Sequence, residues 1–299
     1  MKIIEFEFPN VPKIDEPINL CLGYFDGIHL GHKKIFESAK KEGHKVAVLT
    51  FDNSPAFVLE KIQTNIYLTS TFDKADLLRN LGVDYLLIMH FDLKVAELTK
   101  DEFIENVIKI LNPNKIYCGE DYRFGLRASG TPEYLRYEFS VEVVPTVTNE
   151  NIKISSRDII NFIKEGNVEN ANKLLGRKYS VNGLVIEGKH NGGFLGFPTA
   201  NIDLEYPYVM PKNGVYSGYV RINEKSYKAA IFVGNHPTIS PLLKPIIECY
   251  IIDFSGNLYG KEVYVEFNSF IREEIHFINT DNLIKQIAQD IEIIKNTLH

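Results

Sequence analysis

The chain has 299 residues, a length that favours two domains of ordinary size. With 44% hydrophobic and 24% charged residues, its composition excludes a disordered chain, a fibrous repeat and a small disulfide scaffold. The net charge of −6 argues against a broad basic surface for nucleic acid, so any phosphate site must be built locally.

The cysteines and the apolar runs bear on the compartment. Cys21, Cys118 and Cys249 lie far apart in apolar, strand-like segments, which predicts buried free thiols in a reducing compartment. The N-terminal stretch lacks the apolar core of a signal peptide, and no apolar run approaches the roughly 18 residues of a membrane span. We therefore expect a cytoplasmic protein with neither a membrane nor a nucleic-acid partner.

In the first half of the chain, short apolar runs alternate with segments of helical period. The runs within residues 45–51 and 84–89 are apolar throughout, which is typical of strands covered on both faces. Alternating strands and helices predict a parallel, doubly wound Rossmann-like sheet, which binds ligands at the carboxyl ends of its strands. The expected strands are 18–24, 45–51, 84–89, 115–119 and 141–147, and the expected helices are 31–42, 72–81 and 100–111.

The pattern changes after a helical stretch around residues 157–175. Between residues 178 and 267, strand-like runs are separated by turn clusters, which predicts a small antiparallel β-barrel. Apolar residues at a 3-4-3-4 spacing from residue 284 to 298, behind Thr280 and Asp281, predict an amphipathic helix on that barrel. We place the boundary near residue 178, which gives an N-terminal domain over 1–177 and a C-terminal domain over 178–299.

The first stretch whose residues could take part in catalysis or binding is LGYFDGIHLGH, from Leu22 to His32. It follows an expected strand and opens a helix. Its three glycines allow a ligand to approach the backbone, and the N–H groups at a helix start favour phosphate. His29 and His32 can donate hydrogen bonds to a triphosphate and stabilise charge at an attacked phosphorus. On these residues alone, an incidental glycine-rich turn is an equal alternative. A metal site is a poorer one, because no carboxylate or cysteine lies at ligand spacing.

This stretch carries a family resemblance. H-x-G-H after a first parallel strand is the signature of the nucleotidyltransferase superfamily, and GYFDGIHLGH resembles the adenylyltransferase half of prokaryotic bifunctional riboflavin kinase/FAD synthetases. TFDNSP at 50–55 is similar to the family's Thr-Phe-x-Pro-x-Pro strand end, and GEDYRFG at 119–125 to its G-x-[DN]-F-x-F-G loop. The resemblance implies that His29 and His32 act on the ATP phosphates. The nucleotide or flavin contacts that it implies in this half are Gly23, Phe25, Asp26, Gly31, Asp121, Ser155 and Ser156, and Arg157 beside them is a further candidate.

The second half resembles the riboflavin kinases. GFLGFPTANID at 193–203 contains their P-T-A-N motif, although PTAN alone is more often a turn and a strand start. The segments at 214–220, 233–239, 246–254, 258–263 and 271–274 follow in the family's order. Thr199 and Asn201 offer hard oxygens of the kind that suits Mg²⁺ held together with nucleotide phosphates.

The resemblance also implies roles in this half. Glu248 is the expected general base for the ribityl 5′-hydroxyl, Thr199 and Asn201 the expected holders of Mg²⁺·ATP, and the loop Gly188–Gly196 the expected cover of the phosphates. Arg272 is a candidate for stacking on the isoalloxazine ring. Glu248 interrupts an apolar run, and a carboxylate buried there would have a raised pKa. Strand alternation does not decide whether it is buried or lies on a wet face.

Two positions depart from the family pattern. Where the family has Ser-Ser-[Thr/Ser]-x-Ile-Arg, this chain has Ser155, Ser156 and Arg157, and Ile160 at the arginine position. Isoleucine cannot make the bidentate phosphate contact of a guanidinium, and Arg157, nearly one helical turn earlier, is the candidate replacement. Gly193 stands where the family often has arginine.

The leading hypothesis is a bifunctional enzyme that phosphorylates riboflavin to FMN in its C-terminal domain and adenylylates FMN to FAD in its N-terminal domain. Its expected partners are riboflavin, FMN, FAD, ATP, ADP and pyrophosphate, with Mg²⁺ as cofactor, and the expected state is a monomer or weak oligomer. One alternative keeps only the kinase, with a weakened nucleotidyltransferase domain. Another is a flavin-binding regulator, which has no need of a base such as Glu248. A cytidylyl- or pantetheine-type transferase competes for the first domain alone.

Overall fold

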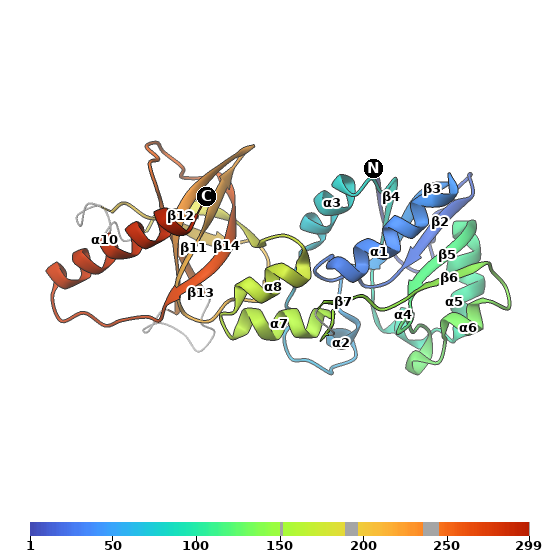
Figure 1. Ribbon diagram of the computed structural model, residues 1–299. Helices are drawn as coiled ribbons and strands as arrows, with labels where there is room; N and C mark the ends of the chain where they lie inside the picture. Colours follow the sequence, from blue (N-terminus) through green and yellow to red (C-terminus); the bar gives the residue numbers. More distant parts are fainter. Residues whose placement is uncertain (150–151, 189–196, 236–244, 299) are drawn as a thin grey trace. The chain divides into compact units, whose positions relative to one another are not determined.

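The computed structural model describes residues 1–149, 152–188, 197–235 and 245–298 (Figure 1). The chain divides into two compact units, Met1–Ser156 and Arg157–His299. Helix α8 (Val168–Leu175) falls in the second unit, where the side-chain amide of Asn172 donates to the carbonyl of Phe267 at 2.9 Å. The boundary near residue 178 stays a prediction from the sequence.

The first unit contains a six-stranded parallel sheet in the order β1-β4-β3-β2-β5-β6, which confirms the predicted doubly wound fold. Strand β1 runs along β4 and was not predicted, because its side chains are exposed or half-buried and give no core pattern. The strands are β1 (Lys2–Phe6), β2 (Ile18–Leu22), β3 (Lys45–Phe51), β4 (Tyr85–Met89), β5 (Pro113–Gly119) and β6 (Val141–Val144). A short hairpin follows, made of β7 (Thr148–Asn149) and β8 (Ile152–Lys153).

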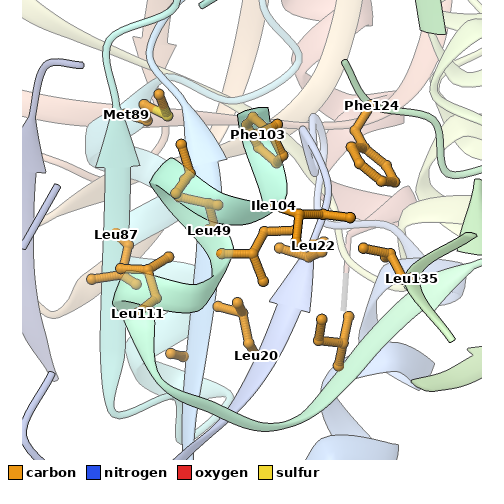
Figure 2. Packing of buried hydrophobic residues seen from close by; sticks show 14 of the residues in the cluster. Leu20, Leu22, Leu49, Leu87, Met89, Phe103, Ile104, Leu111, Phe124 and Leu135 are labelled. Atoms are coloured by element: carbon orange, nitrogen blue, oxygen red, sulfur yellow. The ribbon is translucent and has the colours of Figure 1, made fainter. Parts of the chain in front are cut away.

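Alternate residues of the sheet pack into two separate cores. Leu20 and Leu22 of β2 lie in one core with Phe103 and Leu111 (Figure 2), whereas Cys21 lies in the other. Both faces of the sheet are therefore covered, which explains why its strands are apolar throughout. The helices are α1 (Leu30–Ala39), α2 (Pro55–Val58), α3 (Thr71–Asn80), α4 (Leu93–Glu97), α5 (Lys100–Phe103) and α6 (Pro132–Leu135), with shorter helical turns at Lys40–Glu42, Ile104–Ile108, Lys109–Leu111 and Leu126–Ala128.

The second unit starts with two helices and then closes a barrel. The expected helical stretch at 157–175 is interrupted at Gly166, whose φ of 83° ends helix α7 (Ser156–Lys164) before α8 begins. Six antiparallel strands form the barrel in the order β10-β13-β12-β11-β14-β9, as predicted. They are β9 (Tyr179–Ile186), β10 (Ala200–Leu204), β11 (Gly214–Ile222), β12 (Lys225–Asn235), β13 (Pro245–Ile251) and β14 (Glu262–Arg272).

Helix α10 (Thr280–Thr297) packs on the outside of this barrel. Its Ile291 and Ile294 share an apolar cluster with Val215 of β11 and with Ile252, which confirms the predicted amphipathic helix. Asn279 caps the helix by accepting the N–H of Asn282, one residue before the predicted start. All three cysteines are buried and free, as predicted. Within the described ranges, no helix combines the length and apolarity needed to cross a membrane.

Candidate active sites

The two predicted histidines lie where the turn after β2 enters α1: His29 caps the helix and His32 lies in its first turn. The Nδ1 of His29 accepts the backbone N–H of His32 at 3.3 Å. The two imidazole rings stack with centroids 3.5 Å apart. Because Nδ1 is an acceptor, the neutral His29 ring carries its proton on Nε2 and is a donor there. The first turn of α1 therefore presents backbone N–H groups together with two imidazoles.

Close side-chain packing explains two of the glycines in this turn. A Cβ at position 23 would lie 2.8 Å from the ring of Phe25, and a Cβ at position 31 would lie 3.1 Å from the ring of His29. The Phe25 ring in turn meets the His32 ring edge-on, with centroids 5.1 Å apart. Gly23 and Gly31 thus make room for side chains of the turn itself, a reason that differs from the expected approach of a ligand.

Asp26 joins the same turn to the segment before α3 through hydrogen bonds. Its carboxylate is only 6% exposed and accepts the backbone N–H groups of Leu68 and Thr69 at 3.1 Å. Burial raises the pKa of Asp26, while Lys74 and these hydrogen bonds act in the opposite direction. Asp26 is therefore held by protein groups inside the unit.

The serine motif reaches the turn through one hydroxyl. Ser156, the first residue of α7, donates its Oγ proton to the carbonyl of Asp26 at 2.9 Å. Ser155 directly precedes it and is half-buried, whereas Arg157 is exposed. Arg157 and Ile160 lie three residues apart on α7, so they share one side of the helix. That Arg157 makes the phosphate contact of the arginine that Ile160 replaces stays a prediction.

The two other predicted motifs of the first unit meet at an aromatic pocket of about 460 Å³. Phe51 and Pro55 from TFDNSP line it together with Tyr122 and Phe124 from GEDYRFG. The neighbouring rings of Phe51 and Phe91 lie 4.7 Å apart between centroids. The remaining lining residues include Val95, Ala96, Phe103 and the cationic Lys61, Arg123 and Arg127. Sequence reasoning did not single out these cations, since nothing in the spacing joins them.

Asp121 belongs to the same loop but is not among the lining residues of this pocket. Its side chain is 76% exposed and forms an ion pair with Lys153 of β8 at 3.2 Å. This pair ties the loop after β5 to the β7–β8 hairpin. A contact of Asp121 with a nucleotide or flavin stays a prediction.

A second residue that the sequence did not indicate is Lys74 of α3. It is buried against the turn at residues 23–29, called the histidine turn below. Its ammonium donates to the carbonyl of Tyr24 at 2.9 Å. A helical pattern assigns a lysine to the wet face by default, and only the packing of α3 shows otherwise.

In the barrel, neighbouring strands bring the predicted kinase residues together. Asn201 of β10 lies directly opposite Glu248 of β13, and Thr199 Oγ1 donates to Glu248 Oε2 at 3.3 Å. Gly188 follows β9, and a Cβ there would stand 2.0 Å from the side-chain nitrogen of Asn201. Gly196 and the rest of the predicted loop at 189–195 lie outside the described residues, as do residues 236–244.

The alternation along β13 now places Glu248. Ile247 and Cys249 are fully buried, which leaves Glu248 and Tyr250 on the outer side of the barrel wall, both half-buried. Tyr250 packs against the apolar cluster beneath α10, so this outer face is partly covered. Glu248 thus lies at a border between packed and accessible surface.

A pocket of about 540 Å³ opens beside Thr199. Pro198, Thr199 and Tyr250 line one part, and the turn from Phe254 to Tyr259 lines the other. No charged side chain is among the lining residues of this pocket that the structure describes. Such a lining suits a flat, uncharged group.

Two family models divide the chain between them: one described as FAD synthetase matches residues 11–158, and one described as riboflavin kinase matches residues 175–298. The bifunctional riboflavin kinase/FMN adenylyltransferase of Listeria monocytogenes is 36% identical over 280 residues, which cover 91% of this chain and 89% of the relative. The Bacillus subtilis relative of the same name is 34% identical with the same coverage. This chain belongs to the bifunctional riboflavin kinase/FMN adenylyltransferase family. Both domains of that family are present, which disfavours the kinase-only alternative.

A solved structure supports the whole-chain match. A Streptococcus pneumoniae protein described as a macrolide-efflux protein is 33% identical, covers 99% of both chains and superposes with a TM-score of 0.92. That description differs from the family of the sequence relatives. Two matching family models outweigh it here, because they account for both units of the chain.

Arg272 has a protein partner in this family member. Its guanidinium donates to the Asp290 carboxylate of α10, from Nε at 3.0 Å and from Nη2 at 2.7 Å. Gln286 donates to the same carboxylate at 2.9 Å. This group fastens α10 to the end of β14. Stacking of Arg272 on a flavin stays a prediction.

The barrel site fits a hard cation through its oxygen chemistry. In the described part of the chain, no group of three or more His, Cys, Asp and Glu side chains could hold a metal by themselves. Thr199 and Asn201 instead offer a hydroxyl and an amide oxygen beside the Glu248 carboxylate. Such oxygens suit Mg²⁺ when substrate phosphates complete its coordination.

Proposed function

We propose that this chain catalyses both reactions of its family, at two separate sites. In the second unit, riboflavin and ATP give FMN and ADP. In the first unit, FMN and ATP give FAD and pyrophosphate. The observation that carries the proposal is the cluster of Thr199, Asn201 and Glu248 beside a nucleotide-sized pocket in a chain that also holds His29 and His32 at a helix start.

For phosphorylation, we assign Glu248 as the general base. Its carboxylate takes the proton of the ribityl 5′-hydroxyl as that oxygen attacks the γ-phosphorus of ATP and the bond to ADP breaks. The hydrogen bond from Thr199 at 3.3 Å fixes one carboxylate oxygen and leaves the other for the proton. Bound Mg²⁺, held through Thr199 and Asn201, would offset the phosphate charge.

The adenine ring of this ATP fits the pocket of about 540 Å³ beside Thr199. Its lining is apolar and aromatic apart from small hydroxyl and amide groups, which suits a flat base. Gly188 lies next to Asn201 and allows the amide to approach the backbone after β9. The position of Gly188 therefore supports the predicted role of the loop that begins at this residue in covering the phosphates.

For adenylylation, a phosphate oxygen of FMN attacks the α-phosphorus of ATP, and the bond to pyrophosphate breaks. His29 and His32, together with the N–H groups at the start of α1, stabilise the charge that develops on the phosphoryl oxygens. Gly23, Phe25, Asp26 and Gly31 act indirectly in this assignment, because they shape the turn that presents the two imidazoles.

The isoalloxazine ring of FMN fits the aromatic pocket of the first unit. Phe51, Phe91 and Phe124 offer faces and edges for a flat ring system. Arg123 and Arg127 add positive charge to the lining, which suits the phosphate of FMN. This pocket follows the carboxyl ends of β3 and β5, where doubly wound sheets bind their ligands.

The remaining expectations follow from composition. The acidic net charge and the three buried thiols support a cytoplasmic enzyme that binds no nucleic acid. Mg²⁺ is the proposed cofactor of both reactions. We keep a monomer or weak oligomer as the proposed state.

The test incubates the full chain with riboflavin, ATP and Mg²⁺ and separates FMN and FAD by chromatography. Glu248→Gln is expected to lower FMN formation by about 10²–10⁴-fold, as for a lost general base, while FAD formation from added FMN persists. His32→Asn is expected to do the reverse. Glu224→Gln, in the exposed turn between β11 and β12, is the matched control. FMN without FAD, even when FMN is supplied, would refute the bifunctional proposal. Loss of both activities in the Glu248 variant would refute the separation of the two sites.

A further inference from the structure

Lys74 is among the largest fully buried side chains of the described chain, with 2% of its surface exposed. It lies in α3 next to Ala75 and one turn before Leu78, which are also buried. A buried ammonium is costly unless protein groups replace its hydration shell. Its position therefore calls for a specific partner.

The main partner is the carbonyl of Tyr24 in the histidine turn. Lys74 Nζ donates to this oxygen at 2.9 Å and lies 4.1 Å from the centroid of the Tyr24 ring. Thr50 Oγ1 donates to the same oxygen at 2.7 Å. The two lone pairs of one carbonyl thus accept a lysine and a threonine from two different elements. The peptide between Tyr24 and Phe25 is fixed by both.

That peptide leads directly to the predicted catalytic histidines. Phe25 has a φ of 52°, in the left-handed region that non-glycine residues adopt only when surroundings hold them. Its ring packs edge-on against His32, whose backbone N–H is bound by His29. A shift of the peptide therefore moves the Phe25 ring and the surface on which His32 rests.

The charge of Lys74 matters as much as its hydrogen bond. The carboxylate of Asp26 is buried in the same turn, and that of Asp52 follows β3; both act on Lys74 electrostatically. Asp73, its neighbour on α3, is engaged by the hydroxyl and N–H of Ser70. Without the ammonium, the negative charge near the proposed triphosphate site would rise, chiefly from Asp26, because Asp52 also pairs with His90 at 2.6 Å. Burial lowers the pKa of Lys74 to about 8, against the effect of both aspartates, so it stays mostly charged at neutral pH.

We propose that Lys74 is a positioning residue for FMN adenylylation: it holds the Tyr24–Phe25 peptide and offsets Asp26 and Asp52, so that His32 and the start of α1 meet the ATP phosphates. This inference rests on the proposed adenylyltransferase function. Lys74 acts through the turn and makes no contact with substrate.

The test compares Lys74→Met, which removes both charge and donor, with Lys74→Gln, which keeps an N–H donor without the charge. Exposed Lys94→Met is the control. In the full chain, we expect kcat/KM for ATP in FAD formation to fall about 10- to 100-fold in Lys74→Met, the range for a lost hydrogen bond from a charged group. Lys74→Gln is expected to recover part of this loss. The kinase reaction of the same molecules should keep its rate.

A second readout does not require activity. The imidazole resonances of His29 and His32, assigned by NMR with single histidine variants, should shift in Lys74→Gln, while those of His44 and His276 should not. A chain that forms no FAD even as wild type refutes the proposed adenylyltransferase, and the histidine shifts then decide the positioning role by themselves. Unchanged His29 and His32 resonances, or a Lys74→Met enzyme within twofold of wild type, would overturn the role of Lys74.

Discussion

The contact between Gly188 and Asn201 gives a direct measure of how tightly the barrel site is built. A Cβ at position 188 would stand 2.0 Å from Nδ2 and 2.6 Å from Cγ of Asn201. The amide would have to withdraw by about 1.4 Å to reach an ordinary contact of 3.4 Å. Displacements of about 1 Å at a positioning group cost on the order of 100-fold in rate. We therefore expect Gly188→Ala to lower kcat/KM for riboflavin phosphorylation by about 100-fold.

The assay follows FMN by chromatography at several concentrations of ATP and riboflavin, with FAD formation from added FMN as an internal reference. Gly260→Ala is the control, because a Cβ there meets nothing within 4 Å; its φ of 73° is restrictive, whereas Gly188 has no positive φ. That variant should lose about 1–2 kcal/mol of stability from the left-handed backbone and keep its kinase rate. A Gly188→Ala enzyme within threefold of wild type would show that Asn201 is free to move and that our reasoning is wrong.

Three further predictions test other parts of the chain. Arg272→Met should destabilise the second unit by about 3 kcal/mol in urea unfolding, because it leaves the 3%-exposed Asp290 without its cation. Lys295→Met, which breaks an exposed pair with Asp253, should cost below about 1 kcal/mol, and equal effects would contradict this reasoning. Phe124→Leu should raise KM for FMN about fivefold, the value of one aromatic contact, and leave riboflavin phosphorylation unchanged; an unaltered KM would place the flavin elsewhere. The pKa of His90 is raised by Asp52, so their pair stabilises the fold fully below pH 6.5, and this stabilisation is lost as the pH rises through the raised pKa. Asp52→Asn should therefore lower the pKa of His90 in an NMR titration, and its stability deficit should shrink with rising pH; a deficit that grows would refute the assignment.

The sequence predicted the architecture because its strands carry unambiguous patterns. Runs such as residues 45–51 are apolar on both sides, and the structure covers both faces of that sheet. Strand β1 was not predicted, because it lies at an edge of the sheet and its side chains are exposed or half-buried. The interruption at Gly166 escaped as well, since the apolar spacing of 157–175 does not reveal a left-handed residue.

The candidate sites were predictable to the extent that their residues lie within short motifs. Thr199 and Asn201 are neighbours in the chain, and their meeting with Glu248 follows from the pairing of β10 with β13, which the family resemblance implied without showing. Lys74 could not be found in this way. It lies 50 residues from Tyr24, and its burial depends on how α3 packs beneath the turn. The cations of the aromatic pocket, from residues 61 to 127, share the same difficulty.

The charge balance of the two sites shows how an acidic protein can handle ATP twice. In the first unit the protein supplies the partial positive charge at the start of α1 and the imidazole N–H donors, while the buried Lys74 offsets Asp26 and Asp52 nearby. In the barrel, Glu248 has the hydroxyl of Thr199 as a hydrogen-bond donor and Asn201 on the facing strand, and the described lining of the adjacent pocket is uncharged. A carboxylate base beside a triphosphate is repelled unless a cation stands between them. The composition of the barrel site is therefore itself a reason to expect Mg²⁺ there, whereas in the first unit the imidazoles and the N–H groups at the start of α1 share this task.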